Sequence, residues 1–317
     1  MGAASAAGLQ ARYGAMDLAP AARAARSPSM VVWASTIGSG IGPNLLQPCG
    51  AVAAALRLPK LTAPYLLAVV TLTGASLLIS LTLRPDPSLL ARRLAELQTS
   101  GEQRGPGPNP PSAPLLTLLR DAGSVVRRRS HSLLGLYAVA VGHVAMAAVM
   151  VMTPVHTAHV DVSLTLIGLV ISVHVAGMCA LSPLVGAGAD RFGRIPVLRV
   201  GVGLLLAAYA FAGTAAPDDV VRLGGGLFLL GLGWSCTLVA GSTMLSGGVT
   251  AVERPGVQGL SDLTMNVAGA AGGVIAGLLV AFGTYGLLCT VTAIPIVSLG
   301  AALMRQLQND RKLALQA

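Results

Sequence analysis

The sequence is organised around long apolar runs that contain no charged side chain. One of them, residues 162–189, contains no Asp, Glu, Lys or Arg. A helix needs about 20 apolar residues to cross the hydrocarbon core of a bilayer. Segments that meet this rule lie at 29–56, 62–83, 132–155, 164–188, 195–215, 222–246, 260–282 and 284–304. They predict an all-α, polytopic transmembrane bundle of about eight spans, the first of which is long and is broken or tilted near Pro43 and Pro48.

The composition supports lipid as the solvent of this chain. Hydrophobic residues make up 54% of the sequence and charged residues only 10%, whereas about a quarter of the residues of a soluble domain are charged. The four cysteines lie in apolar runs and form no CxxC pair, which predicts packing roles rather than a disulfide framework or a zinc site.

The basic residues predict the orientation. Eight crossings place both termini on one side, and all but three of the 21 Lys and Arg residues fall on that side; the exceptions are Arg57, Lys60 and Arg222. The positive-inside rule then predicts a multi-pass plasma-membrane protein with both termini in the cytoplasm. The basic residues form no patch interleaved with aromatic residues, so the net charge of +9 does not indicate nucleic-acid binding.

The same pattern divides the chain into five parts. They are a cytoplasmic N-terminal segment at 1–28 that reads as the remnant of a helix end, two spans at 29–83, a cytoplasmic basic linker rich in Pro and Gly at 84–131, a six-helix transmembrane half at 132–305, and a cytoplasmic tail at 306–317. Two stretches of the linker, "SLLARRLAEL" and "LLTLLRDAGSVVRRR", predict short amphipathic helices at the inner membrane surface.

Two motifs carry most of the functional information. "GAGADRFGR" places Gly186, Asp190, Arg191, Gly193 and Arg194 in a short cytoplasmic loop between two spans. Gly186 allows two helix ends to approach, Gly193 allows a tight reversal, and Asp190 can pair with an arginine or with the positive end of a neighbouring helix. Such a cluster predicts a gating loop.

The second motif is "GSGIGP", in which Gly38 and Gly42 form a groove for a neighbouring helix and Pro43 kinks the helix. Together the two motifs resemble the major facilitator superfamily. The resemblance covers residues from about 29 to 305 and implies that the spans correspond to helices five to twelve of that family. It also implies that roughly the first four helices are absent, so that a missing N-terminal half or self-association would complete the bundle.

Two adjacent spans carry a methionine-rich pattern. Met146 and Met150 are spaced i, i+4, and so are His174 and Met178 in the next span, which puts each pair on one helix face. Thioethers favour Cu(I), although methionine is also a common core filler and a buried histidine often bonds a neighbouring helix. The paired motifs resemble the bacterial copper-importer branch of the superfamily linked to cytochrome oxidase assembly, which implies that these four residues relay copper.

Two further polar residues accompany them. His143 lies one turn before the methionine pair and lines the same cavity or packs. Asp262 is a candidate proton relay or a helix cap.

The sequence contains no P-loop, nucleophile elbow or paired-carboxylate constellation, so no enzyme is expected. No cofactor is expected either, because copper would be the transported substrate. The first hypothesis is copper import by alternating access. The alternatives are a proton-coupled transporter of small organic solutes or drugs, and a transport-incompetent fragment or membrane scaffold.

Overall fold

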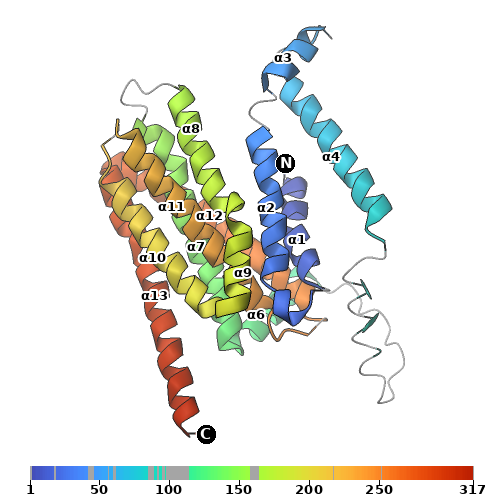
Figure 1. Ribbon diagram of the computed structural model, residues 1–317, viewed down its shortest axis with the longest axis vertical. Coiled ribbons are helices and arrows are strands. Elements are labelled where there is room, and N and C mark those ends of the chain that lie inside the picture. Colours follow the sequence, from blue (N-terminus) through green and yellow to red (C-terminus); the bar gives the residue numbers. More distant parts are fainter. Residues whose placement is uncertain are drawn as a thin grey trace.

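The computed structural model describes residues 2–17, 19–41, 46–55, 57–59, 62–84, 89–90, 93–94, 97, 114–157, 164–216, 218–250 and 252–316. Every element in these ranges is a helix (Figure 1). They are α1 (Gly2–Asp17), the 3-10 turn η1 (Ala21–Arg23), α2 (Arg26–Ile41), α3 (Leu46–Ala55), α4 (Ala63–Thr82), α6 (Leu115–Arg127), α7 (Ser130–Thr157), α8 (Leu164–Val175), the π-helical turn η4 (Ala176–Ala180), α9 (Ser182–Phe192), α10 (Arg194–Gly213), α11 (Val220–Ser246), α12 (Arg254–Phe282) and α13 (Tyr285–Gln316).

Seven helices in the described ranges are long and apolar enough to cross a membrane. The chain is therefore an all-α polytopic bundle, as predicted. Of the remaining predicted span, 29–56, the structure describes α2 and α3. Residues 42–45, which include Pro43, lie outside the described ranges, so the predicted break near Pro43 stays a prediction.

Helix α11 is the axis of the bundle. Some 78% of its span is buried, whereas the span in α4 is 0% buried. It packs against α7, α8, η4, α9 and α10, and glycines let these neighbours approach closely. A Cβ atom at Gly241 would lie 2.9 Å from the carbonyl oxygen of Gly135 in α7, so the backbones of α7 and α11 nearly touch. Close contact through small residues is the usual way in which helices associate in lipid.

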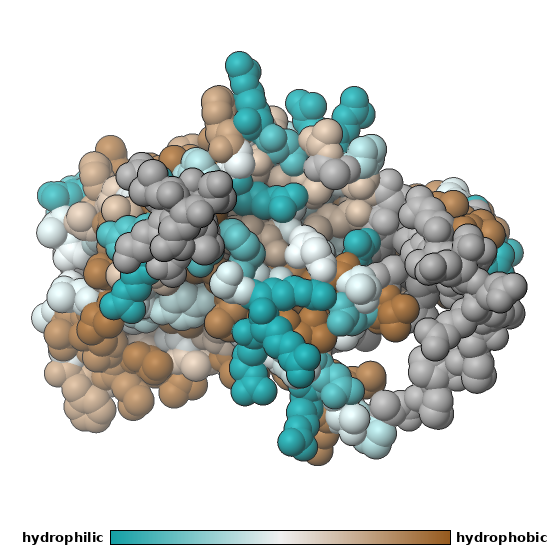
Figure 2. Space-filling model, turned by 90° about the horizontal axis from the view of Figure 1, so that it is seen from below, coloured by the Kyte–Doolittle hydropathy of each residue, from teal (hydrophilic) through white to brown (hydrophobic). Residues whose placement is uncertain are grey.

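The end of the bundle that holds α6, the α9–α10 turn and the α11–α12 loop is called the basic end below. Figure 2 looks at it from below and shows hydrophilic side chains over its centre with apolar side chains beside them. Helix α6 docks there through Ala122 and Val126, which pack with Leu245, Val249 and Val257. The prediction of a helix in the second linker stretch is confirmed, while most of the first stretch lies outside the described ranges.

Residues 2–17 form a helix that packs against α2 and α12, where the sequence predicts a helix end. Figure 1 shows the N-terminal end of α1 at mid-height of the bundle, and the cytoplasmic location of both termini stays a prediction. Two details differ from the sequence prediction. The loop predicted between the spans 164–188 and 195–215 is reduced to Gly193, and α12 begins at Arg254 rather than near residue 260.

The loop before α12 is fixed by a reciprocal pair of hydrogen bonds. The carboxylate of Glu253 accepts a bond of 3.1 Å from the backbone N–H of Thr250, and the backbone N–H of Glu253 donates to the Thr250 hydroxyl. This is a capping box. Arg129, just after α6, adds an ion pair of 3.3 Å with the same carboxylate. The Thr250 backbone bond, followed by smaller contributions that include Arg129, holds the pKa of Glu253 below its ordinary value.

We predict that Glu253→Gln lowers the thermal stability of the detergent-solubilised protein at neutral pH. Because the folded-state pKa of Glu253 is lowered, its contribution is present above its unfolded-state pKa and is lost as the pH falls through the folded-state value. The melting curves of the wild type and the variant should therefore converge below about pH 4. Asp121→Asn, which removes an exposed carboxylate with no ion pair to the described residues, should show no such pH-dependent difference. A constant gap between wild type and Glu253→Gln at all pH values would contradict this account.

Candidate functional site

A cavity of about 460 Å³ lies where α1 and α2 meet the helices of the C-terminal half. Its size falls in the range of small-molecule sites, which is roughly 300–1,000 Å³. The lining residues come from several helices and one π turn: Gly8 and Arg12, Val31, Val32 and Ser35, His143, Val175, Met178 and Cys179, Trp234 and Leu238, and Met265 and Asn266. The lining is mainly apolar, and Arg12 supplies its formal charge.

Arg12 is paired with Asp262 of α12. An Nη2–Oδ1 distance of 2.7 Å joins the two side chains, which are 3% and 12% exposed. The other carboxylate oxygen accepts a 2.6 Å bond from Gln10. Next to this pair, the Tyr13 hydroxyl donates to the Ser261 hydroxyl at 2.8 Å. Two polar residues of α1 thus bind the acidic group of α12, although the two helices lie near opposite ends of the sequence.

The two charges of this pair compensate each other, but one donor of Arg12 is unused. A buried ion pair is destabilised when one partner is removed, typically by about 3–5 kcal/mol, because the other charge is left without compensation. The Nε atom of Arg12 is buried and has no hydrogen-bond partner in the described part of the chain. Asp262 lies two turns inside α12, which begins at Arg254, so the prediction that Asp262 caps this helix is wrong.

An aromatic wall stands beside the ion pair. The indole N–H of Trp234 donates to Nδ1 of His143 at 3.2 Å. Since an indole N–H can only donate, Nδ1 of this histidine is the unprotonated nitrogen. The other edge of the ring fits over Gly269, where a Cβ atom would lie 2.9 Å from Nε2. His143 therefore lines the cavity with a fixed ring orientation.

The four predicted metal ligands are not all on this cavity. Met146 and Met178 pack against the cluster of Val139, Trp234, Leu238 and Met265, and Met178 lines the cavity itself. Met150 packs instead against the main core of the bundle. The four-residue copper site stays a prediction, of which two members share one cluster.

His174 has a different environment. It is 1% exposed, its Nδ1 lies 2.7 Å from the carbonyl oxygen of Leu227 in α11, and its Nε2 has no partner among the described residues. The π turn η4 follows at Ala176–Ala180. Met178 in this turn lines the cavity, whereas His174 is not among the lining residues.

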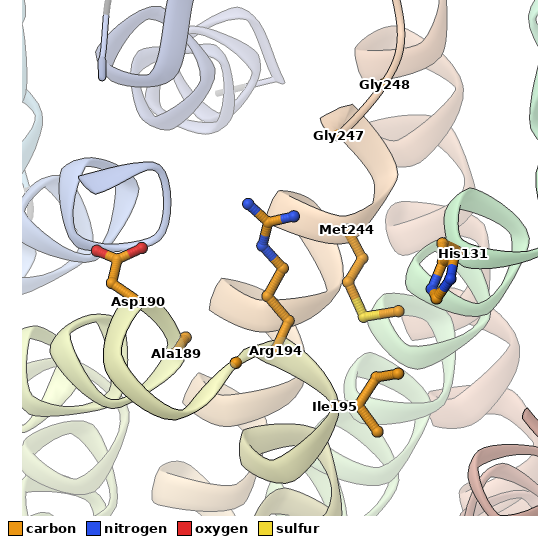
Figure 3. Close-up of a pocket in the computed structure, with 9 residues that line it drawn as sticks. His131, Ala189, Asp190, Arg194, Ile195, Met244, Gly247 and Gly248 are labelled. Carbon is orange, nitrogen blue, oxygen red and sulfur yellow. The ribbon is translucent and has the colours of Figure 1, made fainter. Parts of the chain in front are cut away.

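The bundle has two parts, which are α1–α2 and the six-helix C-terminal half. The predicted gating residues join these two parts at the basic end. The carboxylate of Asp190 accepts the backbone N–H groups of Ala25 and Arg26, each at 2.9 Å, where α2 begins. A carboxylate is stabilised there by the positive end of the helix. Figure 3 shows this carboxylate turned toward the ribbon of α2. Of the two partners expected for Asp190, the structure has the helix end, and no arginine ion pair with Asp190 occurs among the described residues.

Close packing of α2 on α9 accompanies this cap. A Cβ atom at Gly186 would overlap Ser29 and lie 2.9 Å from the carbonyl oxygen of Ala25, so only glycine fits. Ser182 donates to the carbonyl oxygen of Ser29 at 2.9 Å. These contacts and the Arg12–Asp262 pair close the basic end of the cavity.

The remaining motif residues lie around this closure. Gly193 has a φ of 93°, a conformation that favours glycine, and it alone reverses the chain between α9 and α10. Asp190 and Arg191 belong to α9 rather than to a loop. Arg191 lies over the Phe192 ring at 5.4 Å, and Figure 3 shows the Arg194 guanidinium directed toward the end of α11.

The helix-kink motif is only partly described. Gly38 lies in α2 and is exposed, and a Cβ atom added there would meet no atom of the described residues within 4 Å. No neighbouring helix within the described ranges therefore fills the groove at Gly38. Gly42 and Pro43 lie outside those ranges.

Sequence reasoning missed Arg12, Gln10 and Trp234. A tally of basic residues places Arg12 in the cytoplasm, yet it is as buried as a core residue. One signal was available, because a single arginine between apolar stretches, as in "LQARYGAM", is an expensive group in a membrane helix and marks a functional position.

The fold and this central cavity define a polytopic helical membrane protein of the transporter type. A family model for the Major Facilitator Superfamily matches residues 135–314, and the chain belongs to that superfamily. It is 30% identical over 305 residues to the Uncharacterized MFS-type transporter YddS of Bacillus subtilis (strain 168), which is 93% of this chain and 66% of YddS. It is 31% identical over 289 residues to the Uncharacterized MFS-type transporter YdeG of the same organism, covering 90% of this chain and 63% of YdeG.

The chain thus spans somewhat less than two thirds of the length of these curated relatives. Their names state a transporter type and no substrate. The matches support the superfamily and do not extend to its copper-importer branch.

We predict that Gly186→Val separates α2 from α9. The added side chain would overlap Ser29 and the Ala25 carbonyl, and overpacking of this kind typically costs about 1–3 kcal/mol. Hydrogen–deuterium exchange should then accelerate at the amides of Ala25 and Arg26, which Asp190 now protects. Gly188→Val is the matched control, because a Cβ atom there meets only Val197 at 3.8 Å. Equal exchange in the two variants would refute the close-packing role of Gly186.

Proposed function

We propose that the chain is the substrate-binding part of a secondary transporter that moves small organic solutes by alternating access through the cavity beside Arg12. The observation that supports this proposal is the cavity itself. It lies between α1–α2 and the six-helix half, it is mainly apolar, and the Arg12–Asp262 ion pair beside it bridges the two parts. Transporters of this type bind their substrate near the middle of the bilayer, where the two moving parts meet.

The position of the contacts that close the basic end of the cavity also supports alternating access. Asp190, Gly186 and the Arg12–Asp262 pair all join the two parts on the basic side of the cavity. This arrangement corresponds to a conformation closed toward the cytoplasm, if the basic end faces inward as the positive-inside rule expects. Opening it requires the ion pair and the Asp190 cap to separate.

Proton coupling follows from the chemistry of the pair. An ionisable residue inside a membrane helix marks an ion or proton pathway by default. Protonation of Asp262 would remove the negative charge that holds Arg12 and would thereby loosen α1 from α12. Asp262 would then couple proton binding to the opening of the cavity at its basic end.

We predict that purified protein in proteoliposomes accumulates a solute when a pH gradient is imposed, tested with a radiolabelled panel of monocarboxylates, amines and neutral aromatics. Asp262→Asn should abolish accumulation driven by the gradient, since it cannot release a proton, while exchange of labelled for unlabelled solute continues. Asp121→Asn, on the exposed face of α6, is the control and should behave as wild type. Gradient-driven accumulation by Asp262→Asn would rule out its coupling role, and no uptake of any panel member would count against organic-solute transport.

Copper import is the second candidate, favoured by one specific observation. Met146, Met178 and Met265 belong to a single cluster around Trp234, and three thioethers suit Cu(I). Arg12 counts against this reading, because its guanidinium donates to the Met265 sulfur at 3.9 Å and a fixed positive charge repels a cation.

Copper import predicts lower copper accumulation in cells that express Met178→Leu or His174→Ala. Leucine preserves most of the volume of methionine but has no sulfur. Met304→Leu is the matched control, because Met304 is 55% exposed on α13 and far from the cluster in sequence. Accumulation that is unchanged in both site variants would exclude copper as the substrate.

A further inference from the structure

The charges around the cavity are unevenly distributed. Arg12 and Asp262 form its one buried ion pair in the described residues. Tyr13 from α1 and His143 from α7 are the titratable groups that face this pair, and Cys179 from η4 lines the same cavity. Helices α2 and α11 contribute only apolar and neutral polar side chains to the lining. Arg12 is therefore the fixed cation of the site, and Asp262 is its one carboxylate among the described residues.

Arg12 has binding capacity that Asp262 does not use. A guanidinium presents five N–H donors in a planar fork that matches a carboxylate. Asp262 takes one of them at 2.7 Å, the Tyr13 hydroxyl a second at 3.3 Å and the Met265 sulfur a third at 3.9 Å. The buried Nε has no partner in the described part of the chain. Arg12 is also part of the cavity wall, so an acceptor group of a solute in the cavity would meet a guanidinium with unused donors.

We propose that the solute is an organic monocarboxylate, and that its carboxylate group binds Arg12 when Asp262 carries a proton. This inference rests on the proposed function and names its substrate class. Two carboxylates on one guanidinium would leave a net negative charge in an interior of low dielectric, which is strongly unfavourable. A proton on Asp262 removes that charge, and the neutral acid can still act as a hydrogen-bond partner of Gln10.

The proton and the charge balance in each step. The solute enters as an anion, the Asp262 carboxylate takes up one proton, and the Arg12 ion pair passes from Asp262 to the solute. Release reverses the exchange: Asp262 gives up its proton, pairs again with Arg12, and displaces the solute. One negative charge and one proton cross together, so the cycle moves no net charge.

The rest of the lining selects the other end of the solute. Trp234, Met178 and Met265 provide an aromatic face and two thioethers, which suit an aromatic or aliphatic group. A cationic amine fits poorly, because Arg12 would repel it and Asp262 is already neutralised by its ion pair. The cavity therefore favours a compact carboxylate with an apolar body.

The test measures binding of phenylacetate and of its neutral isostere phenylacetamide to the full chain in lipid nanodiscs. Trp33, which is 40% exposed, is replaced by Phe so that fluorescence reports on Trp234, the second of the two tryptophans. Phenylacetate should bind more tightly than phenylacetamide at low pH. Its affinity should fall with rising pH by up to about tenfold per unit, the limit for one linked proton, whereas phenylacetamide should show no such slope.

Three site variants and one control variant test the assignment further. Asp262→Asn should bind phenylacetate with no pH slope, because its side chain is always neutral. Arg12→Gln should lose the preference for phenylacetate, and Arg12→Lys, which keeps the charge, should retain part of it. Arg23→Gln, an exposed arginine in η1, should match the parent protein. The wild-type pH slope and the Lys variant keep the test decisive if Arg12→Gln does not fold.

Equal affinity for the two probes, a preference that survives Arg12→Gln, or no binding of either probe would each overturn the carboxylate assignment. None of these results alone would reject organic-solute transport, which is judged by the wider uptake panel. That proposal fails separately if no panel solute protects Cys179, a lining thiol, from alkylation and none is taken up.

Discussion

The buried ion pair between Arg12 and Asp262 is the interaction on which the arrangement of the bundle depends. It joins the first helix of the chain to α12 at 2.7 Å, in a place where neither charge has water to replace its partner. A buried charge without compensation is far more costly than a broken surface pair. The two helices must therefore stay together for as long as both residues are charged. The cavity above this contact exists because the helices that line it are held together at one end by this pair and by the contacts between α2 and α9.

Much of the fold follows from the sequence because lipid leaves few choices. Apolar runs of sufficient length must form helices whose backbone groups are satisfied internally, and seven of the eight predicted spans are single helical crossings or close to them. Hydropathy places the start of α12 too late, near residue 260 rather than at Arg254. The reason is visible in the chain, since Thr250 and Glu253 form a capping box before Pro255, and proline favours the first turn of a helix. The capping box and the proline indicate a helix start that hydropathy alone does not detect.

The site was harder to predict, since its key contacts join distant positions. Nothing near Arg12 in the sequence indicates Asp262 as its partner, and a tally of basic residues treats every arginine as a loop charge. The His174–Met178 pair stays a prediction. His174 lies against Leu227 of α11, whereas Met178 lines the cavity, and a spacing rule does not show which neighbouring helix each side chain meets. By contrast, the tight turn at Gly193 was predicted, because such a turn has a short-range signature. Asp190 lies in α9 rather than in a loop, and it caps α2, which is distant in sequence.

The single-residue junction at Gly193 has a mechanical consequence. With only one residue between them, the adjoining ends of α9 and α10 cannot change their separation freely, and the two helices form an elbow. Helix α10 is in turn wedged against α11, since a Cβ atom at Gly201 would lie 2.8 Å from the Cβ of Cys236. Any force that α2 exerts on Asp190 is thus passed through the elbow to the axis of the bundle. A small displacement at the basic end can in this way tilt the wall of the cavity.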